Sequence, residues 1–294
     1  MKIFKYLSLA ILSLATASCE KHEIEYPADP IPANSAMVQI HYMVPQSSST
    51  AKSIYKIELD GNSYVNNNAA LMAVYGSYPG SSKYYTVKAG SSVSLKLYQS
   101  SDMNLVYDNT ISGLEAGKKY QVIVHDFAEA PKVLDCDFSF KDDVATEGNM
   151  TELTAQYHFI NFINMMYEDD GTPYQGTLQY LYQITTDWEN SIKSEWLPVG
   201  GPVAFGESTG WQKLNLVNNP ELIDAAYARV DYRIVDASGN DLEIIKSVAG
   251  DGTKSYGTYS DYWTGYAGRH NIHFMRGFRS NTASAAGVTQ WVQY

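Results

Sequence analysis

The stretch 255–269 concentrates the side chains with the clearest binding chemistry in this sequence. It reads SYGTYSDYWTGYAGR, with tyrosine and tryptophan interleaved among serine, glycine and aspartate. Aromatic side chains offer large, rigid contact area, while serine and glycine let a loop adapt to a ligand. Aromatic faces also suit the C–H faces of sugars, although the same rings could instead turn inward and cap a core. We predict an insertion that binds a polysaccharide or a partner protein through Tyr256, Tyr259, Asp261, Tyr262, Trp263, Tyr266 and Arg269.

Residues 206–210 (GESTG) match the G-x-S-x-G pattern of a hydrolase nucleophile elbow. That elbow needs a strand before the serine and a helix after it. Pro202 lies just upstream of the motif, and residues 211–216 follow it with the alternation of a strand. We therefore predict an ordinary loop here, and no catalytic residue in the chain.

Three groups of residues could be read as metal sites, and each has a plainer explanation. Residues 236–243 match a calcium loop superficially, but Asp241 stands where such a loop needs glycine, so we predict a hairpin turn. The acidic run 168–171 is predicted to be a hairpin tip. His270 and His273 are three residues apart, which places them on opposite faces of a strand. The sequence predicts no metal and no cofactor.

The segments around these candidates alternate with a period of two, which is typical of β-strands. Val38, Ile40 and Tyr42 share one face, and residues 230–234 repeat the pattern in the second half. Asp-Gly, Pro-Gly and Ala-Gly pairs separate such segments and indicate turns. Helix signal is strongest at 219–226, which begins with an Asn-Pro pair. The pattern predicts an all-β fold of two tandem antiparallel Ig-like β-sandwich domains.

The two halves also match one another in the same order along the chain. Residues 38–42 match 155–159, 75–76 match 205–206, 93–97 match 230–234, and 116–118 match 267–269. The spacing between the copies only grows, as a duplicated domain with insertions in its second copy would give. His41 and His158 take equivalent positions, and we expect both to be ordinary strand histidines.

The N-terminus is predicted to be an export signal followed by an acylation site. Two lysines precede an apolar run at 6–17, which is too short to cross a membrane. Residues 16–19 (TASC) resemble the lipobox of bacterial lipoproteins, although that family usually has leucine where this chain has Thr16. The resemblance implies a lipid anchor on Cys19 in the outer membrane, facing the surface of a Gram-negative cell. The predicted parts are a signal peptide at 1–18, a flexible tether at 19–36, domains at 37–140 and 153–294, and a linker at 141–152.

Charge and cysteine content limit the class of partner. The chain has a formal net charge of −11, and loss of the signal peptide with its two lysines makes it more acidic. It lacks the basic stripe that nucleic acid requires, so no nucleic acid partner is predicted. With Cys19 acylated, Cys136 has no disulfide partner, and we predict that it is a buried structural residue.

Residues 37–130 resemble an exported bacterial family, domain of unknown function 4397. The matching features are the first strand ending in His41, the turn 60–61, the pair 75–76, and the segments 85–90 and 114–120. The last segment (LEAGKKY) also looks like a tyrosine corner, in which the Tyr120 hydroxyl bonds to backbone just upstream. Asn271 stands at the corresponding place in the second half. The resemblance implies an Ig-like architecture and brings no catalytic residues.

Together these patterns predict a non-catalytic envelope lipoprotein that acts in surface binding or adhesion. One alternative is a structural spacer or assembly subunit that uses its sheet edges, which burial of Tyr259, Tyr262 and Trp263 would favour. A second alternative is a carbohydrate hydrolase, which needs two carboxyl groups about 5–10 Å apart across a cleft.

Overall fold

The computed structural model describes residues 31–66, 68–140, 157–187, 189–216 and 227–293. Apart from two short 3-10 helices, every regular element of these residues is a strand, which confirms the predicted all-β fold. No helix among them is long and apolar enough to cross a membrane. The predicted signal peptide, Cys19, the linker and the helix at 219–226 lie outside the described residues.

The described strands fall into two halves of the chain. The first half contains β1 (Ser35–Tyr42), β2 (Ile54–Leu59), β3 (Asn62–Val65), β4 (Ser77–Tyr78), β5 (Tyr85–Lys88), β6 (Val93–Gln99), β7 (Asn104–Ile111), β8 (Lys119–Val124), β9 (Lys132–Asp135) and the 3-10 helix η1 (Thr50–Lys52). The second half contains β10 (Tyr157–Tyr167), β11 (Leu178–Asp187), β12 (Ile192–Lys193), β13 (Leu197–Pro198), β14 (Ser208–Asn215), β15 (Tyr227–Asp236), β16 (Ile244–Val248), β17 (Lys254–Gly257), β18 (Tyr259–Tyr266), β19 (His270–Phe278), β20 (Gly287–Gln293) and the 3-10 helix η4 (Thr282–Ser284).

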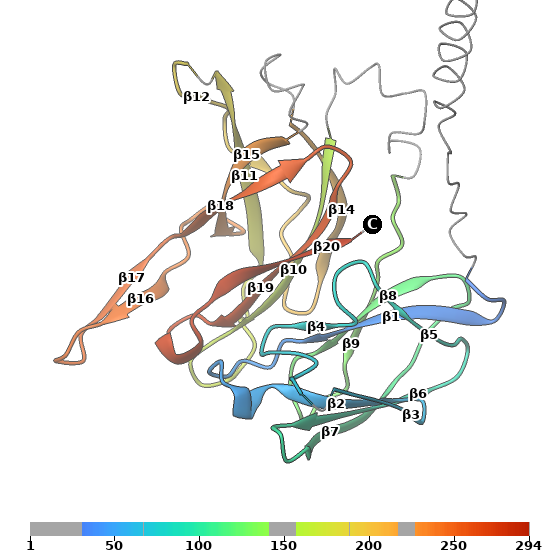
Figure 1. The fold of residues 1–294 in the computed structure, drawn as a ribbon. Helices are drawn as coiled ribbons and strands as arrows, with labels where there is room; N and C mark the ends of the chain where they lie inside the picture. Colours follow the sequence, from blue (N-terminus) through green and yellow to red (C-terminus); the bar gives the residue numbers. More distant parts are fainter. Residues whose placement is uncertain (1–30, 67, 141–156, 188, 217–226, 294) are drawn as a thin grey trace, which may run out of the picture. The chain divides into compact units, whose positions relative to one another are not determined.

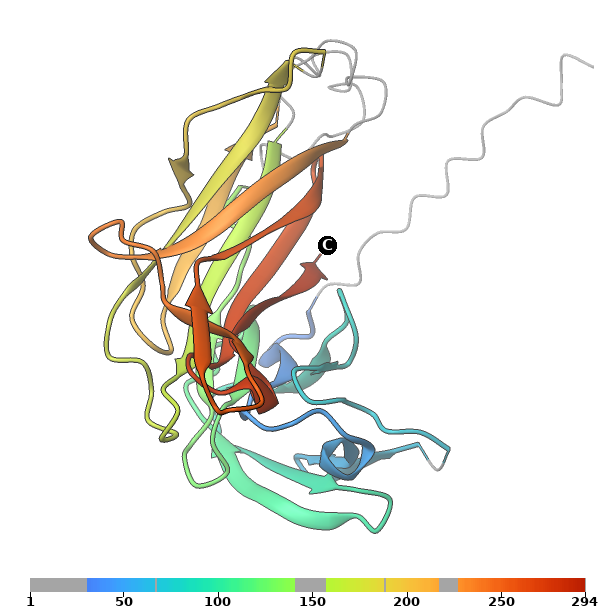
Figure 2. The same cartoon turned by 90° about the vertical axis from the view of Figure 1, so that its left-hand side faces the viewer.

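The two halves have the same strand order. The sheets of the first half run β4-β1-β8-β9 and β3-β2-β6-β7, and those of the second run β14-β10-β19-β20 and β12-β11-β15-β18. Figures 1 and 2 show the first half in blue and green and the second from yellow-green to red. The matched segments 93–97 and 230–234 lie on β6 and β15, which are counterparts in this order. The segments 116–118 and 267–269 likewise precede the counterparts β8 and β19.

One strand pair in each half departs from the predicted antiparallel arrangement. β1 pairs with β8 in parallel, and β10 pairs with β19 in parallel. Parallel neighbours need a long connection rather than a tight turn. Between β1 and β8 the chain forms all strands of the other sheet of the first half, and between β10 and β19 it does the same in the second half. These intervening strands supply the long connection.

Three cores hold four sheets in a stack. One core lies between the two sheets of the first half, and a second lies between the two sheets of the second half. The third joins the halves, with Met43 and Ile123 from the first packing against Phe159, Ile163 and Phe274 from the second. Residues 31–294 accordingly form one compact unit. β1 begins at Ser35, inside the predicted tether, while the predicted domain limits stay predictions.

The sequence of β10 explains why this strand can lie in the middle of the stack. It reads YHFINFINMMY and is buried along almost its whole length. Its odd-numbered residues Phe159, Ile163 and Met165 face the core that joins the halves, while Phe162 and Met166 face the core of the second half. A strand covered on both faces shows a continuous apolar run instead of alternation.

The tyrosine corner of the first half is present. The backbone N–H of Glu115 donates to the hydroxyl of Tyr120 at 2.9 Å, and the Tyr120 ring is buried. This confirms the hydrogen bond expected from the segment 114–120. The Ig-like class and the family resemblance stay predictions.

Candidate functional site

The predicted aromatic loop is a regular strand, β18, at the edge of a second-half sheet. Its side chains alternate: Tyr262 is 54% exposed, whereas its neighbour Trp263 is 4% exposed. The expectation of an adaptable loop is therefore wrong for residues 259–266. From Tyr262 to Tyr266 exposed and buried side chains alternate, as expected for a strand with one face covered.

The outward side chains of β18 lie beside outward side chains of β15, which is paired with it in register. Asp231 is opposite Tyr262, and Tyr227 is opposite Tyr266. Gln183 of β11 follows on the other side of Asp231. These strands form what we call the aromatic face, made of Gln183, Lys193, Trp196, Tyr227, Arg229, Asp231, Arg233, Ser260, Tyr262 and Tyr266. A shallow hollow in this face is lined by Gln183, Lys193, Trp196, Arg229, Asp231, Tyr232, Ser260, Asp261 and Tyr262.

Cationic side chains stack on the aromatic rings of this face. The guanidinium carbon of Arg229 lies 3.8 Å from the centroid of the Tyr262 ring. Arg269 lies 3.9 Å from the centroid of Tyr266. Arg233 lies 4.8 Å from the centroid of Trp196. Each of these contacts places a cation over one face of a ring, and at exposed sites such a contact is worth about 0.5–1 kcal/mol.

Asp231 bonds two cations of the aromatic face, Arg229 and Lys193. Arg229 Nε donates to its Oδ1 at 2.8 Å, and Lys193 Nζ donates to its Oδ2. Burial alone would raise the pKa of the Asp231 carboxyl, but the hydrogen bonds from Lys193 and Arg229 outweigh burial and leave the pKa lowered. The carboxylate is thus charged at neutral pH and anchors the arginine that stacks on Tyr262.

Two of the predicted site residues belong to the core instead. Trp263 packs in the core of the second half, and its Nε1–H donates to the hydroxyl of Tyr180 at 2.9 Å. Tyr259 packs against the same core, and its hydroxyl accepts from the Val288 N–H at 2.8 Å. Both residues pack against the core of the second half from β18, so neither belongs to the exposed aromatic face.

The other predicted residues divide between two places. Tyr262, Tyr266 and Arg269 come together on or beside the aromatic face, and Asp261 lines its hollow. Tyr256 lies on β17, in a separate two-stranded sheet formed with β16. That hairpin, and not 255–269 as a whole, is the insertion between β15 and β18 (Figure 1).

The sequence reading missed the part of the site that lies on β15. Arg229, Asp231 and Arg233 alternate with the apolar residues that predicted this strand. Since successive side chains point to opposite faces, an apolar inner row implies a charged outer row at these positions. No sequence pattern predicts that Trp196 belongs to the site, because its contact with Arg233 depends on which distant strands become neighbours.

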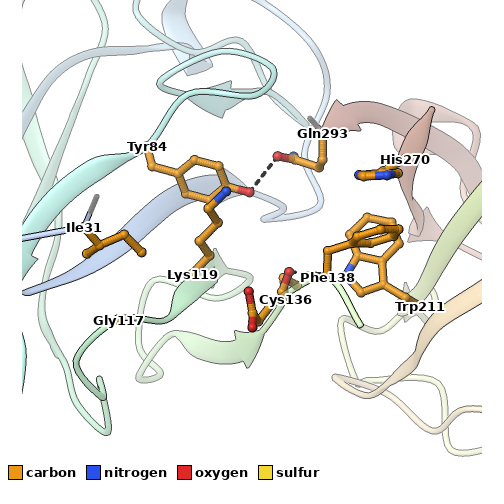
Figure 3. A pocket seen from close by; sticks show the side chains of 10 residues that line it. Ile31, Tyr84, Gly117, Lys119, Cys136, Phe138, Trp211, His270 and Gln293 are labelled. Atoms are coloured by element: carbon orange, nitrogen blue, oxygen red, sulfur yellow. Dashed lines mark hydrogen bonds between the residues drawn. The ribbon is translucent and has the colours of Figure 1, made fainter. Parts of the chain in front are cut away.

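A second hollow lies where the two halves meet (Figure 3). On one side Tyr84 donates to Gln293 Oε1 at 2.7 Å, with the Lys119 ammonium 5.4 Å from the Tyr84 ring centroid. On the other side the Phe138 ring stacks on His270, with ring centroids 3.6 Å apart. The polar atoms of Tyr84 and Gln293 already bond one another across the two halves, so we interpret this hollow as part of the junction.

The buried polar groups nearby extend that junction. Gln293 Nε2 also donates to Gln39 Oε1 at 2.7 Å, and Gln121 Nε2 donates to the Tyr84 hydroxyl at 3.2 Å. His41 Nε2 bonds Gln121 Oε1. These bonds link the sheets of the two halves, although His41 Nδ1 is buried without a hydrogen-bond partner. Polar bonds of this kind favour one arrangement of the packed sheets.

The remaining sequence candidates have structural roles. Ser208 begins a strand, β14, so the predicted loop is wrong for residues 208–210. No helix follows the serine, so the context of a nucleophile elbow is missing. Asp236 accepts hydrogen bonds from the backbone of Ser238 and Asn240, as a turn requires. No group of three or more histidine, cysteine, aspartate or glutamate side chains in the described ranges could hold a metal ion.

His270, His273 and Cys136 also have structural surroundings. His270 faces the junction and His273 bonds Tyr180 in the second-half core, so the two lie on opposite faces of β19 as predicted. Cys136 is buried, and burial raises the pKa of its thiol to about 12. A thiol with so high a pKa is not a nucleophile at neutral pH.

Comparison with known proteins adds little to this geometry. No family model matches the chain, and no curated protein matches it. Among solved structures it is similar to a candidate cell adhesion protein from Bacteroides eggerthii, with 9% identity and a TM-score of 0.20, over 90% of this chain and 98% of the other. At that TM-score the similarity carries no argument about fold or function.

Proposed function

We propose that this protein is a non-catalytic binding protein of the cell envelope and that its aromatic face binds a polysaccharide. The observation that supports this most directly is the exposed ring of Tyr262, which lies against Arg229 beside a polar hollow. A sugar ring can stack on Tyr262 while its hydroxyls bond the side chains that line the hollow. Binding surfaces combine exposed aromatic rings with polar groups held in place by hydrogen bonds, and this face has both.

Replacing Tyr262 with alanine is expected to weaken polysaccharide binding at least tenfold. Removal of an aromatic anchor at the centre of a binding surface commonly costs more than about 1.4 kcal/mol, which is a factor of ten in affinity. Tyr256→Ala is the matched control, because Tyr256 is 46% exposed but lies on the β16–β17 hairpin. Glycans selected on an array are titrated calorimetrically against both variants. Equal losses in the two variants would contradict the proposed site.

The location of the protein is proposed from its N-terminus. A lipid on Cys19 would attach the compact unit 31–294 to the outer membrane through a short tether. A protein at this location would encounter the polysaccharides of the cell envelope, so the proposed location agrees with the proposed binding role. Labelling of cells with a palmitate analogue, compared between the natural chain and Cys19→Ala, tests the anchor.

A structural role is the second candidate, and two observations favour it. Trp263 is buried and Tyr259 half-buried, as expected for a spacer or assembly subunit. β18 is also an edge strand, so its backbone could accept a strand from another chain. Tyr262, in contrast, is exposed, which is why we place binding first.

A hydrolase remains the third candidate and gains no support from the carboxyl groups. A glycosidase general acid needs a raised pKa. Among the described aspartate and glutamate residues with a displaced pKa, the pKa is lowered in every case: Glu58, Asp170, Asp187, Asp231, Asp236 and Asp251.

A further inference from the structure

A third hollow opens at the junction of the two halves, beside Arg276. Alternate residues of β19 face the first half: Ile272 and Phe274 pack in the core that joins the halves, and Arg276 follows them at the end of the row. The first half contributes residues from the segments after β1 and before β4, and the second contributes residues of η4 and β20. The full lining is Gln46, Ser48, Val74, Tyr75, Arg276, Ala283, Ser284, Ala285 and Thr289.

The guanidinium of Arg276 is oriented by the protein but not fully bonded by it. Its Nε donates to Thr289 Oγ1 at 2.9 Å, and its Nη1 donates to the Ala285 carbonyl at 3.1 Å. Its central carbon lies 4.3 Å from the centroid of the Tyr75 ring. A guanidinium has five N–H donors, so most of the donors of this one are left for another acceptor.

Arg276 also has no acidic partner among the described residues. The nearby arginine of the same region, Arg279, shows the contrast, since its Nε donates to both oxygens of Glu168 at 2.8 and 3.1 Å. Burial lowers the pKa of Arg276, and the groups that act against this are tyrosines rather than carboxylates. A partly buried cation without a counter-charge is costly, and a bound anion would remove that cost.

The rest of the lining suits an oxyanion. The hydroxyls of Ser48 and Thr289 can donate to an anion, whereas the Ser284 hydroxyl is shared with Tyr75 and the Gln46 amide donates to the Tyr42 hydroxyl. The lining contains no aspartate or glutamate. An anion placed against Arg276 would therefore meet hydrogen-bond donors and no repelling charge. This is unusual in a chain with 32 acidic and 21 basic side chains.

The backbone around the hollow is shaped by two special residues. Gly277 has φ +92°, and a Cβ there would lie 2.7 Å from the Ser284 carbonyl oxygen. Only glycine lets η4 lie this close to β19, directly beside Arg276. Tyr75 has φ +64°, an uncommon conformation for an aromatic residue, and its hydroxyl bonds the Ser284 hydroxyl. Tyr75 of the first half and η4 of the second half therefore both lie beside Arg276.

We propose that this hollow is a carboxylate-binding site in which Arg276 receives the anion. The planar fork of an arginine matches a carboxylate with two parallel N–H···O bonds. The small polar lining fits a single acidic sugar or a small organic acid. The site is separate from the aromatic face, so it does not depend on the proposed polysaccharide function.

The test uses the chain from residue 20, which keeps the compact unit 31–294, with glucuronate, acetate and neutral glucose as probes. Calorimetry and thermal unfolding are expected to show saturable binding of glucuronate but not of glucose.

Arg276→Gln is expected to lose at least tenfold in affinity for glucuronate. Arg276→Lys is expected to lose part of that affinity, because an ammonium lacks the planar pair of N–H donors of a guanidinium. Arg279→Gln is the control that should bind like the natural chain, because the Arg279 charge is paired with Glu168 there. Binding of acetate as tight as glucuronate would assign the site to small organic acids, and tighter glucuronate binding to acidic sugars.

A second variant keeps the test decisive if Arg276→Gln does not fold. Ser48 is exposed and lines the hollow, so Ser48→Asp can place a carboxylate near Arg276 without disturbing a core. It is expected to raise the unfolding temperature and to abolish glucuronate binding. The proposal is overturned if the natural chain binds neither glucuronate nor acetate, or if Ser48→Asp and Arg276→Gln bind as well as the natural chain.

Discussion

Replacing Trp263 with alanine is expected to lower the free energy of unfolding by about 3–5 kcal/mol, the usual cost of truncating a buried large aromatic residue. The Trp263 ring lies between two buried histidines, with centroids 4.8 Å from His158 and 5.7 Å from His273. The variant also removes the donor that the buried hydroxyl of Tyr180 accepts from. Urea unfolding followed by circular dichroism measures the change.

The adjacent position supplies the control for that experiment. Tyr262 is one residue away but faces outward, and Tyr262→Ala is expected to change the free energy of unfolding by less than about 1 kcal/mol. The two variants therefore separate stability from binding on neighbouring residues. If Tyr262→Ala destabilised the protein more than Trp263→Ala, the assignment of inward and outward faces of β18 would be wrong.

Acid is expected to unfold this protein through its buried histidines. Burial lowers the pKa of His41 and of His158 to about 4, from an ordinary value of 6.5. Between these values the unfolded chain binds protons that the folded chain does not, so stability falls as pH drops from about 6.5 towards 4. Each histidine is worth roughly 3 kcal/mol over that interval, and two of them approach the whole stability of a typical domain.

Urea midpoints measured from pH 7.5 to 4 test this expectation. His158→Asn is a useful variant, because asparagine can still donate to the Tyr266 carbonyl that His158 Nδ1 bonds at 3.0 Å, but it cannot take up a proton. Its stability should fall less steeply with acid than that of the natural chain. A stability that stays constant from pH 6.5 to 4.5 would contradict the buried, neutral state of both histidines.

The sequence was most informative where one face of a strand is buried and the other is polar. Val38, Ile40 and Tyr42 predicted the inward row of β1, and Tyr120 predicted a backbone hydrogen bond that is present. The parallel pairing of β1 with β8 was not predictable from local pattern. It depends on which distant strands become neighbours, and alternation alone does not encode that.

The candidate site was predicted only in part, for a related reason. Five aromatic residues drew attention to 255–269, but their burial depends on the register of β18 against β15, which separates Tyr262 from Trp263. Arg229 and Asp231 could have been inferred as the outer row of a predicted strand. Trp196 and the stacking of Arg233 on it arise from tertiary packing and could not.

The central claim, that the aromatic face is the binding surface, is tested most directly by hydroxyl-radical footprinting of the chain from residue 20 with and without a polysaccharide selected on a glycan array. We predict that the ligand protects Tyr262 and Tyr266 from oxidation severalfold, while Tyr256 on the β16–β17 hairpin is oxidised equally in both samples. Failure to find any glycan that binds, or protection at Tyr256 with none at Tyr262, would contradict the account.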